Sequence, residues 1–396
     1  MLVYEFKAYG KPEQFRAIDD AIRTGQFIRN KCIRFWIDNQ GTNKATLSAL
    51  CKTLAAEFSF ANELNSMARQ AHAERAWFAI SRFYNNCKKQ VKGKKGYPQF
   101  KNNSRSVEYK TSGWKFNPKR KAITFTDDKN IGRLKLKGGY DLNDDQLKNI
   151  KRVRMIRRAG QYFVQFCIKS DRLEPKTQTG QAIGIDVGLK EFYTDSEGVK
   201  VENPRFLRTS EERLKVEQRR LSKKKRGGRN RAKARLKVAK KHLKISRQRK
   251  DWVTKLARCV AQSNDLVVCE DLKVSNMLKN HNLAKSISDA SWYMFRVKLE
   301  YFCKIFGTEM IAVAPHGTSQ ECSACGEIVK KSLSTRTHVC KCGCVLDRDE
   351  NAAINILNKG LGVVGHTIPV QIDVQKALGE EDLCLAGENL LSKFNR

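Results

Sequence analysis

The sequence predicts a multidomain α/β protein that also contains a small antiparallel β-barrel or sheet. Two observations carry this prediction. Apolar residues recur at every second position over much of 107–168, which is typical of half-buried strands. From Ala182 onward, short apolar runs alternate with helical segments, which indicates a mixed sheet covered by helices. The length of 396 residues accommodates two or three domains with cores of their own.

The N-terminal part is expected to form the barrel, with a helical domain inserted after its first strand. The segment LVYEFKAYG alternates, and a helical pattern begins near Glu13. A second helical block covers roughly 44–90, with apolar residues at the spacing of one helix face. The prediction therefore assigns about 1–12 and 104–171 to the barrel and about 13–103 to the inserted helical domain.

The C-terminal part is expected to follow a linker at 172–180. The runs AIGIDVG, LVVCED and MIAVAP read as buried strands, separated by hairpin and helical patterns. The predicted order is an α/β domain at 181–319 with strongly basic helices at 209–262, a cysteine-rich ribbon at 320–346, a last α/β segment at 347–360 and a flexible tail at 361–396.

The charge balance indicates a polyanionic partner. Lys and Arg number 77 against 41 Asp and Glu, a net charge of +36. Each cation laid on a phosphate releases condensed counterions, so this excess favours nucleic acid. A membrane-surface role is disfavoured because no long apolar run or amphipathic anchor is found. An odd count of 13 cysteines, without a secretory signal, argues against a disulfide framework. The expected compartment is the reducing cytoplasm of a bacterium.

Three acidic residues stand at the ends of predicted elements. Asp186 ends one apolar strand, Glu270 ends another, and Asp349 precedes the helix NAAINILNK. Strand ends and helix starts converge at one edge of an α/β sheet. Three carboxylates there can hold two Mg²⁺ or Mn²⁺ ions about 4 Å apart, which activate water and stabilise the leaving oxygen of a phosphodiester.

Each of these acids alone has a simpler explanation. Asp349 could cap its helix, and Asp186 could be a turn residue. Three such acids in so basic a chain favour the catalytic interpretation. Asp271 and Asp347 are adjacent alternatives, and Glu270 is preferred over Asp271 because strand alternation cannot point both inward.

Five cysteines between residues 322 and 344 form a candidate metal knuckle. Cys322 and Cys325 make a C-x₂-C pair, and Cys340 and Cys342 make a shorter C-x-C pair, with Cys344 as an alternative member. Four thiolates at this spacing fit a tetrahedral zinc site with a structural role. An iron–sulfur cluster suits so short and polar a ribbon less well.

A basic stretch lies in the middle of the chain. Half of the residues from Arg213 to Lys250 are Lys or Arg, Glu217 is their only acid, and Gly227–Gly228 interrupts the helical pattern. Like charges at helical spacing repel unless a polyanion neutralises them. We interpret the stretch as two helices that cradle nucleic acid without reading bases. The predicted contacts are the cations around the break, Lys223, Lys224, Lys225, Arg226, Arg229 and Arg231.

Aromatic residues accompany cations in the N-terminal part as well. Such rings either stack on unpaired bases or belong to an ordinary barrel core, and the sequence favours neither. The rings in question are Tyr97, Phe100, Tyr109, Trp114 and Phe116.

Together these features resemble the TnpB family, the RNA-guided nucleases of bacterial insertion sequences that are related to type V CRISPR effectors. The resemblance covers residues 1 to about 360, and the order and spacing of its motifs make it specific. Its motifs are GIDVGLK (184–190), LSKKKRGGRNRAKARLKVAKKH (221–242), CEDLKV (269–274), DASW (289–292), TSQECSACG (318–326) and LDRDENAAINIL (346–357).

The resemblance implies a RuvC-like nuclease domain of RNase H fold with an inserted zinc ribbon, preceded by a wedge β-barrel with an inserted helical recognition domain. It implies that Asp186, Glu270 and Asp349 bind the catalytic Mg²⁺ (or Mn²⁺). A guide RNA from the transposon end would pair with double-stranded target DNA, while the protein reads a short adjacent motif. Ser66 and Gln70 match, loosely, a family pattern near that motif.

The predicted function is therefore that of an RNA-guided DNA endonuclease of a bacterial insertion sequence, located in the cytoplasm at the nucleoid. One alternative is a non-catalytic RNA- or DNA-binding regulator of transposition, against which the three intact acids argue. Another is a small type V CRISPR effector nuclease, which the sequence alone does not separate from the first reading.

Overall fold

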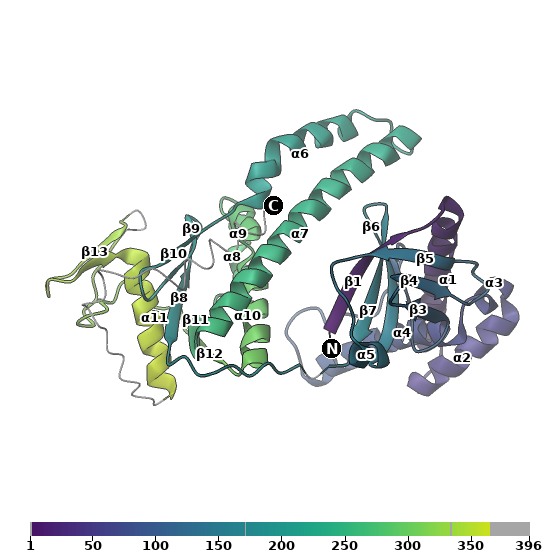
Figure 1. The fold of residues 1–396 in the computed structure, drawn as a ribbon, viewed down its shortest axis with the longest axis horizontal. Helices are drawn as coiled ribbons and strands as arrows, with labels where there is room; N and C mark the ends of the chain where they lie inside the picture. The colour runs from purple at the N-terminus through teal and green to yellow at the C-terminus, as the bar shows by residue number, and fades with distance from the viewer. Residues whose placement is uncertain (1, 171, 333–334, 365–396) are drawn as a thin grey trace. The chain divides into compact units, whose positions relative to one another are not determined.

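The computed structural model describes residues 2–170, 172–332 and 335–364. Packing divides the chain into two compact units, Met1–Asp171 and Arg172–Arg396 (Figure 1). Each unit has a hydrophobic core of its own. Within the described residues, no helix combines the length and the apolar character needed to cross a bilayer.

The first unit is built on a seven-stranded sheet in which neighbouring strands are antiparallel. The order is β2-β6-β7-β1-β5-β4-β3, so the first strand of the chain lies in the middle of the sheet. The period-two pattern is visible in β5, where Leu134 and Leu136 are buried between exposed cations. The strands are Leu2–Tyr9 (β1), Ser106–Tyr109 (β2), Trp114–Asn117 (β3), Ala122–Phe125 (β4), Gly132–Lys137 (β5), Ile150–Arg158 (β6) and Gln161–Ile168 (β7).

Helices are inserted between β1 and β2, as the sequence predicts. Asn43 and Asn65 cap the second and fourth of these helices by accepting bonds from backbone amides of the first turn. The helical block expected at 44–90 is interrupted at Phe58, where extended backbone separates two helices. The helices of this unit are Pro12–Asp38 (α1), Lys44–Glu57 (α2), Ser59–Asn62 (α3), Ser66–Lys88 (α4) and Asp144–Lys148 (α5).

The second unit contains a five-stranded mixed sheet in the order β10-β9-β8-β11-β12. Strands β8, β11 and β12 are parallel, whereas β9 and β10 run antiparallel to their neighbours. The expected α/β domain with a mixed sheet is present. The strands are Ala182–Val187 (β8), Glu191–Asp195 (β9), Lys200–Glu202 (β10), Leu266–Glu270 (β11) and Glu309–Val313 (β12), and a separate small sheet pairs Thr337–Val339 (β13) with Val345–Asp347 (β14).

Helices cover both faces of the five-stranded sheet. Ile183, Ile185 and Val267 pack against α7 and α10 on one face, and Val268 packs against α11 on the other. Figure 1 shows α11 on one side of the sheet and α10 on the other. The helices are Phe206–Ser222 (α6), Arg229–Ser263 (α7), Val274–Met277 (α8), Ala284–Ala290 (α9), Trp292–Phe306 (α10) and Arg348–Val364 (α11).

Two glycines let α11 lie directly on the sheet. A Cβ atom at Gly184 of β8 would stand 2.2 Å from the carbonyl oxygen of Ala353 in α11. A Cβ atom at Gly360 of α11 would stand 2.4 Å from Cγ2 of Val268 in β11. Any larger residue at either position would push α11 away from the sheet, because close-packed interiors accept little extra volume.

Two predicted boundary segments can be compared with the structure. The linker at 172–180 has no helix or strand, but it is attached to the second unit. The amides of Thr179 and Gly180 each donate to the carboxylate of Asp265 at 2.7 Å. The tail predicted from residue 361 is still helical through Val364, because α11 continues to that residue. The rest of the predicted tail, 365–396, lies outside the described residues.

Candidate functional site

Two of the three predicted carboxylates stand at matching positions of adjacent parallel strands. The pairing of β8 with β11 places Cys269 opposite Ile185, so the next residues in register are Glu270 and Asp186. Matching positions of parallel strands point to the same face. That face is the one covered by α11, because Ile185 points to α7 and α10.

The third carboxylate, Asp349, reaches the same place from the first turn of α11. Ala353, one turn further along, lies against Gly184, two residues before Asp186 on β8. Burial raises the pKa of Asp186 well above its usual value, and the nearby charges of Glu270 and Asp349 raise it further. The structure therefore brings together the three acids that the sequence singles out.

The acids are spaced more widely than ligands of a single small ion. Among the described residues, the four cysteines discussed below are the group whose possible ligand atoms all lie within 4.8 Å of one another. The oxygens of the three carboxylates exceed that limit.

The neighbouring acids Asp347 and Asp271 have other partners. Asp347 accepts a bond from the amide of Asp349 at 2.8 Å and pairs with Lys200 at 2.7 Å. Asp347 therefore caps the start of α11, which is the simpler role that the sequence also allowed for Asp349. Asp271 pairs with Arg296 at 2.5 Å. Asp349 itself lies 3.6 Å from Arg336 in a longer ion pair, and Asp349 and Glu270 are the acids whose charges act on Asp186.

A set of hydrogen bonds connects Glu270 and the start of the cysteine ribbon to α11. The buried Thr318 donates from Oγ1 to Oε1 of Glu270 at 2.7 Å. Asn355 of α11 donates to the carbonyl oxygens of Thr318 at 2.9 Å and of Glu321 at 2.7 Å. Asn351, one turn earlier, donates to the same Glu321 carbonyl at 2.8 Å. These residues orient the carboxylate of Glu270, and the sequence analysis assigned them no role.

Replacing Thr318 by Val should weaken metal binding at this centre. The change removes the donor to Glu270 while preserving the shape of the side chain, and partners of metal ligands contribute about 10- to 100-fold to affinity or activity. We expect the Mg²⁺ concentration for half-maximal DNA cleavage to rise about ten-fold. Thr318→Ser keeps the hydroxyl and should stay close to wild type. An unchanged Mg²⁺ requirement in Thr318→Val would contradict the role given to this bond.

Without a bound metal ion, the neighbouring carboxylates lower the stability of the folded protein. Burial raises the pKa of Glu270 as well, although the Thr318 hydrogen bond and the charge of Lys359 oppose the rise. A group whose pKa is higher in the folded than in the unfolded chain stabilises the fold fully below its unfolded pKa, and that contribution is lost as pH rises through the folded pKa. The ionised site therefore costs stability at neutral and alkaline pH.

Asp186→Asn should accordingly raise the melting temperature of the protein in Mg²⁺-free buffer at pH 8. A gain of about 2–4 °C is the shift that about 1 kcal/mol produces in a domain of 150–250 residues. The gain should be smaller at pH 5, where Asp186 of the wild type keeps more of its proton. Adding Mg²⁺ should stabilise the wild type more than the variant, since a ligand stabilises the state that binds it. A variant that melts below the wild type at pH 8 would exclude this account.

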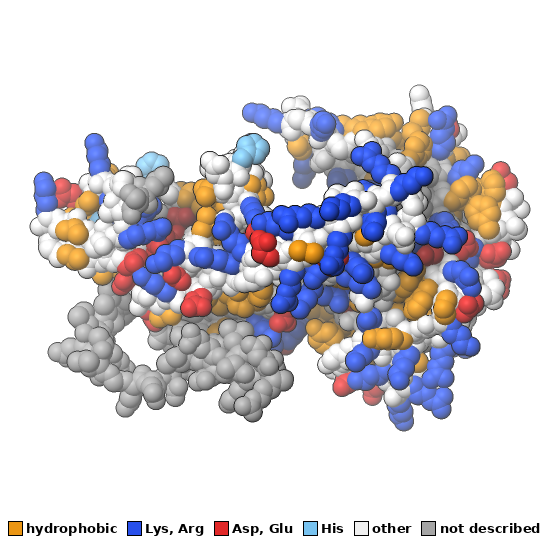
Figure 2. Space-filling model, turned by 90° about the horizontal axis from the view of Figure 1, so that it is seen from above, with side chains coloured by type: hydrophobic (Ala, Val, Ile, Leu, Met, Phe, Trp, Pro, Cys, Tyr) orange, Lys and Arg blue, Asp and Glu red, His pale blue; other side chains and the backbone are white. Residues whose placement is uncertain are grey.

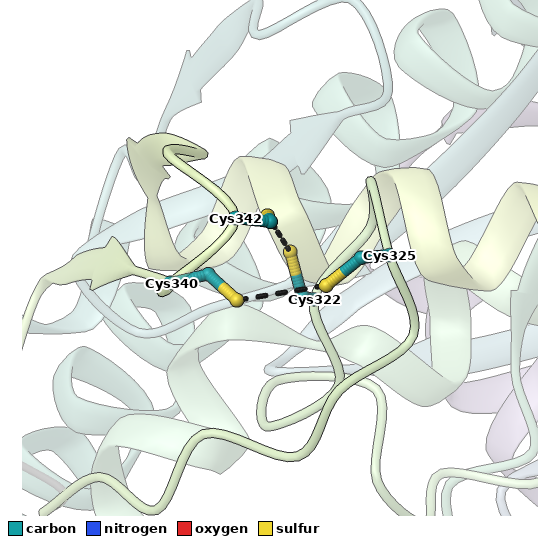
Figure 3. A group of neighbouring side chains, drawn as sticks. All are labelled: Cys322, Cys325, Cys340 and Cys342. Carbon is teal, nitrogen blue, oxygen red and sulfur yellow. Dashed lines mark hydrogen bonds between the residues drawn. The ribbon is translucent and has the colours of Figure 1, made fainter.

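The second centre is a group of four cysteines, Cys322, Cys325, Cys340 and Cys342 (Figure 3). The sulfur atoms of Cys322 and Cys342 are 3.7 Å apart, and those of Cys325 and Cys340 are 3.6 Å apart. Zn–S bonds of about 2.3 Å at tetrahedral angles imply sulfur–sulfur distances of about 3.8 Å. The four thiols can therefore hold a zinc ion with little rearrangement.

Two turns shape this cysteine centre. The amide of Gly326 donates to the carbonyl of Cys322 at 2.8 Å, and Gly326 has a φ of +78°, which favours glycine. The amide of Cys340 donates to the carbonyl of Cys344 at 2.9 Å. Cys344 thus contributes its backbone to the second turn and is not one of the four grouped thiols. Burial opposes ionisation of Cys322, but amides of Cys325 and Ala324 bond to its sulfur and bring its pKa down to about 5.

The basic stretch forms a helical hairpin of α6 and α7, as predicted. The turn between them spans 223–228, and Gly227 has a φ of +82°. Figure 2 shows Lys and Arg side chains lining this hairpin in the middle of the view. Five of the six predicted nucleic-acid contacts are exposed at or beside the turn, namely Lys223, Lys224, Lys225, Arg226 and Arg229.

The sixth predicted contact, Arg231, has a structural use. Its Nη1 donates to the carbonyl oxygens of Leu221 at 3.0 Å and of Lys224 at 2.8 Å. These bonds close the turn and satisfy carbonyls at the end of α6, which have no partner within the helix. Arg231 therefore shapes the surface that carries the other cations.

The base of the hairpin is fixed by Asp289, which belongs to the DASW segment. Its buried carboxylate accepts bonds from the amides of Leu207 at 2.9 Å and Arg208 at 3.1 Å, at the N-terminus of α6. The same carboxylate binds the guanidinium of Arg249 on α7 at 2.6 Å. Asp289 thus caps one helix and pairs with the other, a role that the sequence analysis did not assign.

Ser66 and Gln70 lie on the first turns of α4 and line an open pocket of about 360 Å³ between α2 and α4. The start of α4 is tied to the sheet of the first unit through Asp127. Its carboxylate accepts from the amide of Asn65 at 3.1 Å and from the hydroxyl of Tyr109 at 3.0 Å. The two predicted contacts are therefore presented together from a fixed helix start.

Comparisons with known proteins agree with the resemblance seen in the motifs. The family described as "Probable transposase" (OrfB_IS605) matches residues 165–281. The family described as "Cas12f1-like, TNB domain" matches residues 292–356. A solved structure, "Cryo-EM structure of the Cas12f1-sgRNA-target DNA complex", gives a TM-score of 0.57 at 15% identity and covers 89% of this chain and 84% of that chain. At this identity the likeness concerns the fold alone.

Curated relatives extend over most of the chain. A Streptomyces pristinaespiralis protein named "Putative RNA-guided DNA endonuclease" is 32% identical over 372 residues, covering 90% of this chain and 89% of the relative. The Escherichia coli (strain K12) protein "Putative RNA-guided DNA endonuclease InsQ" is 29% identical over 232 residues, covering 54% of this chain and 58% of the relative. "TnpB-like protein L79" of Acanthamoeba polyphaga mimivirus is 31% identical over 131 residues, covering 31% of this chain and 25% of that protein. The chain belongs to the TnpB family.

Proposed function

We propose that this protein is an RNA-guided DNA endonuclease of a bacterial insertion sequence, acting in the cytoplasm at the nucleoid. It would cleave target DNA next to a short adjacent motif by two-metal hydrolysis in a RuvC-like, RNase H-fold domain. The observation that carries the proposal is the convergence of Asp186, Glu270 and Asp349 at the edge of β8, β11 and α11. Carboxylates in this number suit Mg²⁺ or Mn²⁺.

The three acids would share the binding of the metal ions. Asp186 would hold the ions together with Glu270 and Asp349, since its carboxylate lies near the charges of both. When bound, the ions would supply an activated water and stabilise the leaving oxygen of the phosphodiester. The Thr318 hydroxyl would keep Glu270 oriented toward the ions. The raised pKa of Asp186 means that protons should compete with the ions, so that loading of the site weakens as pH falls.

The remaining features support nucleic-acid partners. Five exposed cations around the α6–α7 turn and a net charge of +36 suit a phosphate backbone. We assign this surface to the guide RNA or its pairing with target DNA, and we assign Ser66 and Gln70 to the adjacent motif. The cysteine centre would hold a structural zinc ion. Its ribbon is joined to α11 through Asn351 and Asn355, so zinc binding would also stabilise the position of Asp349.

A purely regulatory, non-catalytic role explains these features less well. Three acids brought together in a half-buried place cost folding free energy without a cation. A binding protein has no reason to keep such a site. A small type V CRISPR effector would use the same centre, and the origin of the bound RNA distinguishes it from a transposon-encoded nuclease.

The proposal is tested by purifying the chain with the RNA it binds, sequencing that RNA and challenging the complex with a plasmid. The plasmid carries a sequence complementary to the guide portion next to a randomised flank. We expect Mg²⁺-dependent cleavage at plasmids with one short flanking sequence, and RNA that originates from a transposon end. Absence of cleavage by an RNA-loaded complex would refute the nuclease function. RNA from a repeat array would assign the chain to a CRISPR system.

A further inference from the structure

Four aromatic rings form a partly exposed cluster in the first unit. Trp36 comes from the last turn of α1, Phe83 and Tyr84 come from α4, and Tyr97 comes from the loop after α4. The ring centroid of Tyr97 lies 5.4 Å from that of Trp36 and 5.3 Å from that of Phe83, and Trp36 lies 6.0 Å from Tyr84. Tyr84 and Tyr97 nevertheless remain 50% and 53% exposed. Tyr84 and Tyr97 therefore pack against other rings of the cluster and still expose about half of their surface to solvent.

The loop that carries Tyr97 is tied to both helices. Asn86 of α4 donates to the carbonyl of Lys95 at 3.0 Å. Asn30 of α1 exchanges two bonds of 2.9 Å with the backbone of Lys101. Arg29 of the same helix donates to the carbonyl of Gln99 at 3.1 Å. The ring of Tyr97 is therefore held in place before any partner arrives, which lowers the entropy cost of binding.

The segment around these rings carries charge of one sign. From residue 76 to residue 107 the sequence contains no Asp or Glu. A polyanion is the partner that such a surface attracts, whereas an interface between copies of this basic chain would bring like charges together. The cations of the segment are Arg82, Lys88, Lys89, Lys92, Lys94, Lys95, Lys101 and Arg105.

We propose that the cluster of Trp36, Phe83, Tyr84 and Tyr97 is a stacking site for unpaired bases of RNA. The proposal rests on the proposed function, since the guide RNA is the ligand that the chain would carry. Flat faces supported by further rings bind any base, and each stacked base contributes about 1–3 kcal/mol. The indole N–H of Trp36 donates to the hydroxyl of Tyr84 at 3.0 Å. That leaves the hydroxyl hydrogen of Tyr84 to donate to a ribose 2′-OH, the group that distinguishes RNA from DNA.

The test measures binding of a 12-nucleotide oligouridylate and of the matching oligodeoxyuridylate to the full chain in Mg²⁺-free buffer, over a series of salt concentrations. Tyr97→Ala and Tyr84→Ala remove the exposed faces, and Tyr97→Phe keeps a ring. Phe78→Ala is the matched control, because Phe78 lies on α4, is 52% exposed and stands outside the cluster. Lys92→Gln removes a neighbouring cation instead of a ring.

We expect Tyr97→Ala and Tyr84→Ala to bind the RNA about ten-fold more weakly, the loss that about 1.4 kcal/mol of stacking produces. Tyr97→Phe and Phe78→Ala should bind within about two-fold of wild type. The slope of log affinity against log salt should not change in the ring variants. It should become shallower by about 0.7 in Lys92→Gln, because only that variant removes a phosphate contact to a single strand.

Three results would overturn the inference. The first is unchanged RNA affinity in both alanine variants. The second is an equal loss for RNA and DNA in Tyr84→Ala, the variant that also removes the hydroxyl assigned to the ribose 2′-OH, which would assign the rings to a displaced DNA strand. The third is a changed oligomeric state at unchanged RNA affinity, which would assign them to a contact between copies. If the protein failed to cleave DNA but its RNA binding still depended on Tyr97, the result would count against the nuclease function and not against this site.

Discussion

Substituting the three acids one at a time, as Asp186→Ala, Glu270→Gln and Asp349→Asn, is expected to reduce DNA cleavage at least about a thousand-fold. Each change removes one carboxylate and its negative charge from the proposed ion site, and activated water and leaving-group stabilisation are lost together. Binding of the guide RNA and of target DNA should stay within about two-fold, because the exposed cations of the α6–α7 turn lie on other elements. The measurement is the single-turnover cleavage rate of the RNA-loaded complex, with affinities taken in Mg²⁺-free buffer.

Asp271→Asn is the matched control for Glu270→Gln. The two acids are adjacent in sequence, but Asp271 pairs with Arg296 and Glu270 accepts from Thr318. We expect Asp271→Asn to cleave within about three-fold of wild type. Equal losses in Asp271→Asn and Glu270→Gln would mean that the strand register does not define the site.

Cys342→Ser should release the zinc ion, whereas Cys344→Ser should retain about one zinc per chain. Cys342 belongs to the group of four thiols, and Cys344 contributes a backbone carbonyl to the turn. Structural zinc contributes its binding free energy to folding, about 10–16 kcal/mol in small peptides. We expect Cys342→Ser to melt earlier and to cleave DNA at least about ten-fold more slowly, because the ribbon and α11 are joined through Asn351 and Asn355.

Zinc content by elemental analysis decides this prediction independently of activity. Loss of zinc in Cys344→Ser with retention in Cys342→Ser would reverse the assignment of the fourth thiolate. If Cys342→Ser protein contained no zinc but cleaved DNA at the wild-type rate, the zinc ribbon would not be needed to position Asp349.

The sequence was sufficient to predict that the three acids lie near one another, because their positions follow from elementary rules of the fold. Asp186 and Glu270 each end an apolar run, and parallel strands bring such ends to one edge. The cysteines were predictable because ligand spacing along the chain reflects the small size of a zinc site. The basic hairpin was predictable because like charges repel one another when they lie three or four residues apart on one helix face. Such a pattern can be read directly from the sequence.

The supporting contacts were not predictable, because their partners are far apart in the chain. Thr318 bonds to Glu270 across 48 positions, and Asp289 caps α6 across 82 positions. No local pattern marks such pairs, which depend on how the sheet and helices pack. The burial of the aromatic rings could not be predicted from the sequence either. Tyr109 is fully buried, and Trp114 and Phe116 pack against the core, whereas Tyr97 is 53% exposed and Phe100 47% exposed.

The central claim is that β8, β11 and α11 bring Asp186, Glu270 and Asp349 to one metal site. Crystals of the protein soaked in Mn²⁺, with anomalous diffraction recorded at the manganese edge, test it most directly. The account predicts an anomalous peak, or a pair of peaks about 4 Å apart, bounded by the three carboxylates, and loss of the peaks in Asp186→Asn crystals. Manganese bound elsewhere, with no peak among these carboxylates at saturating Mn²⁺, would contradict it.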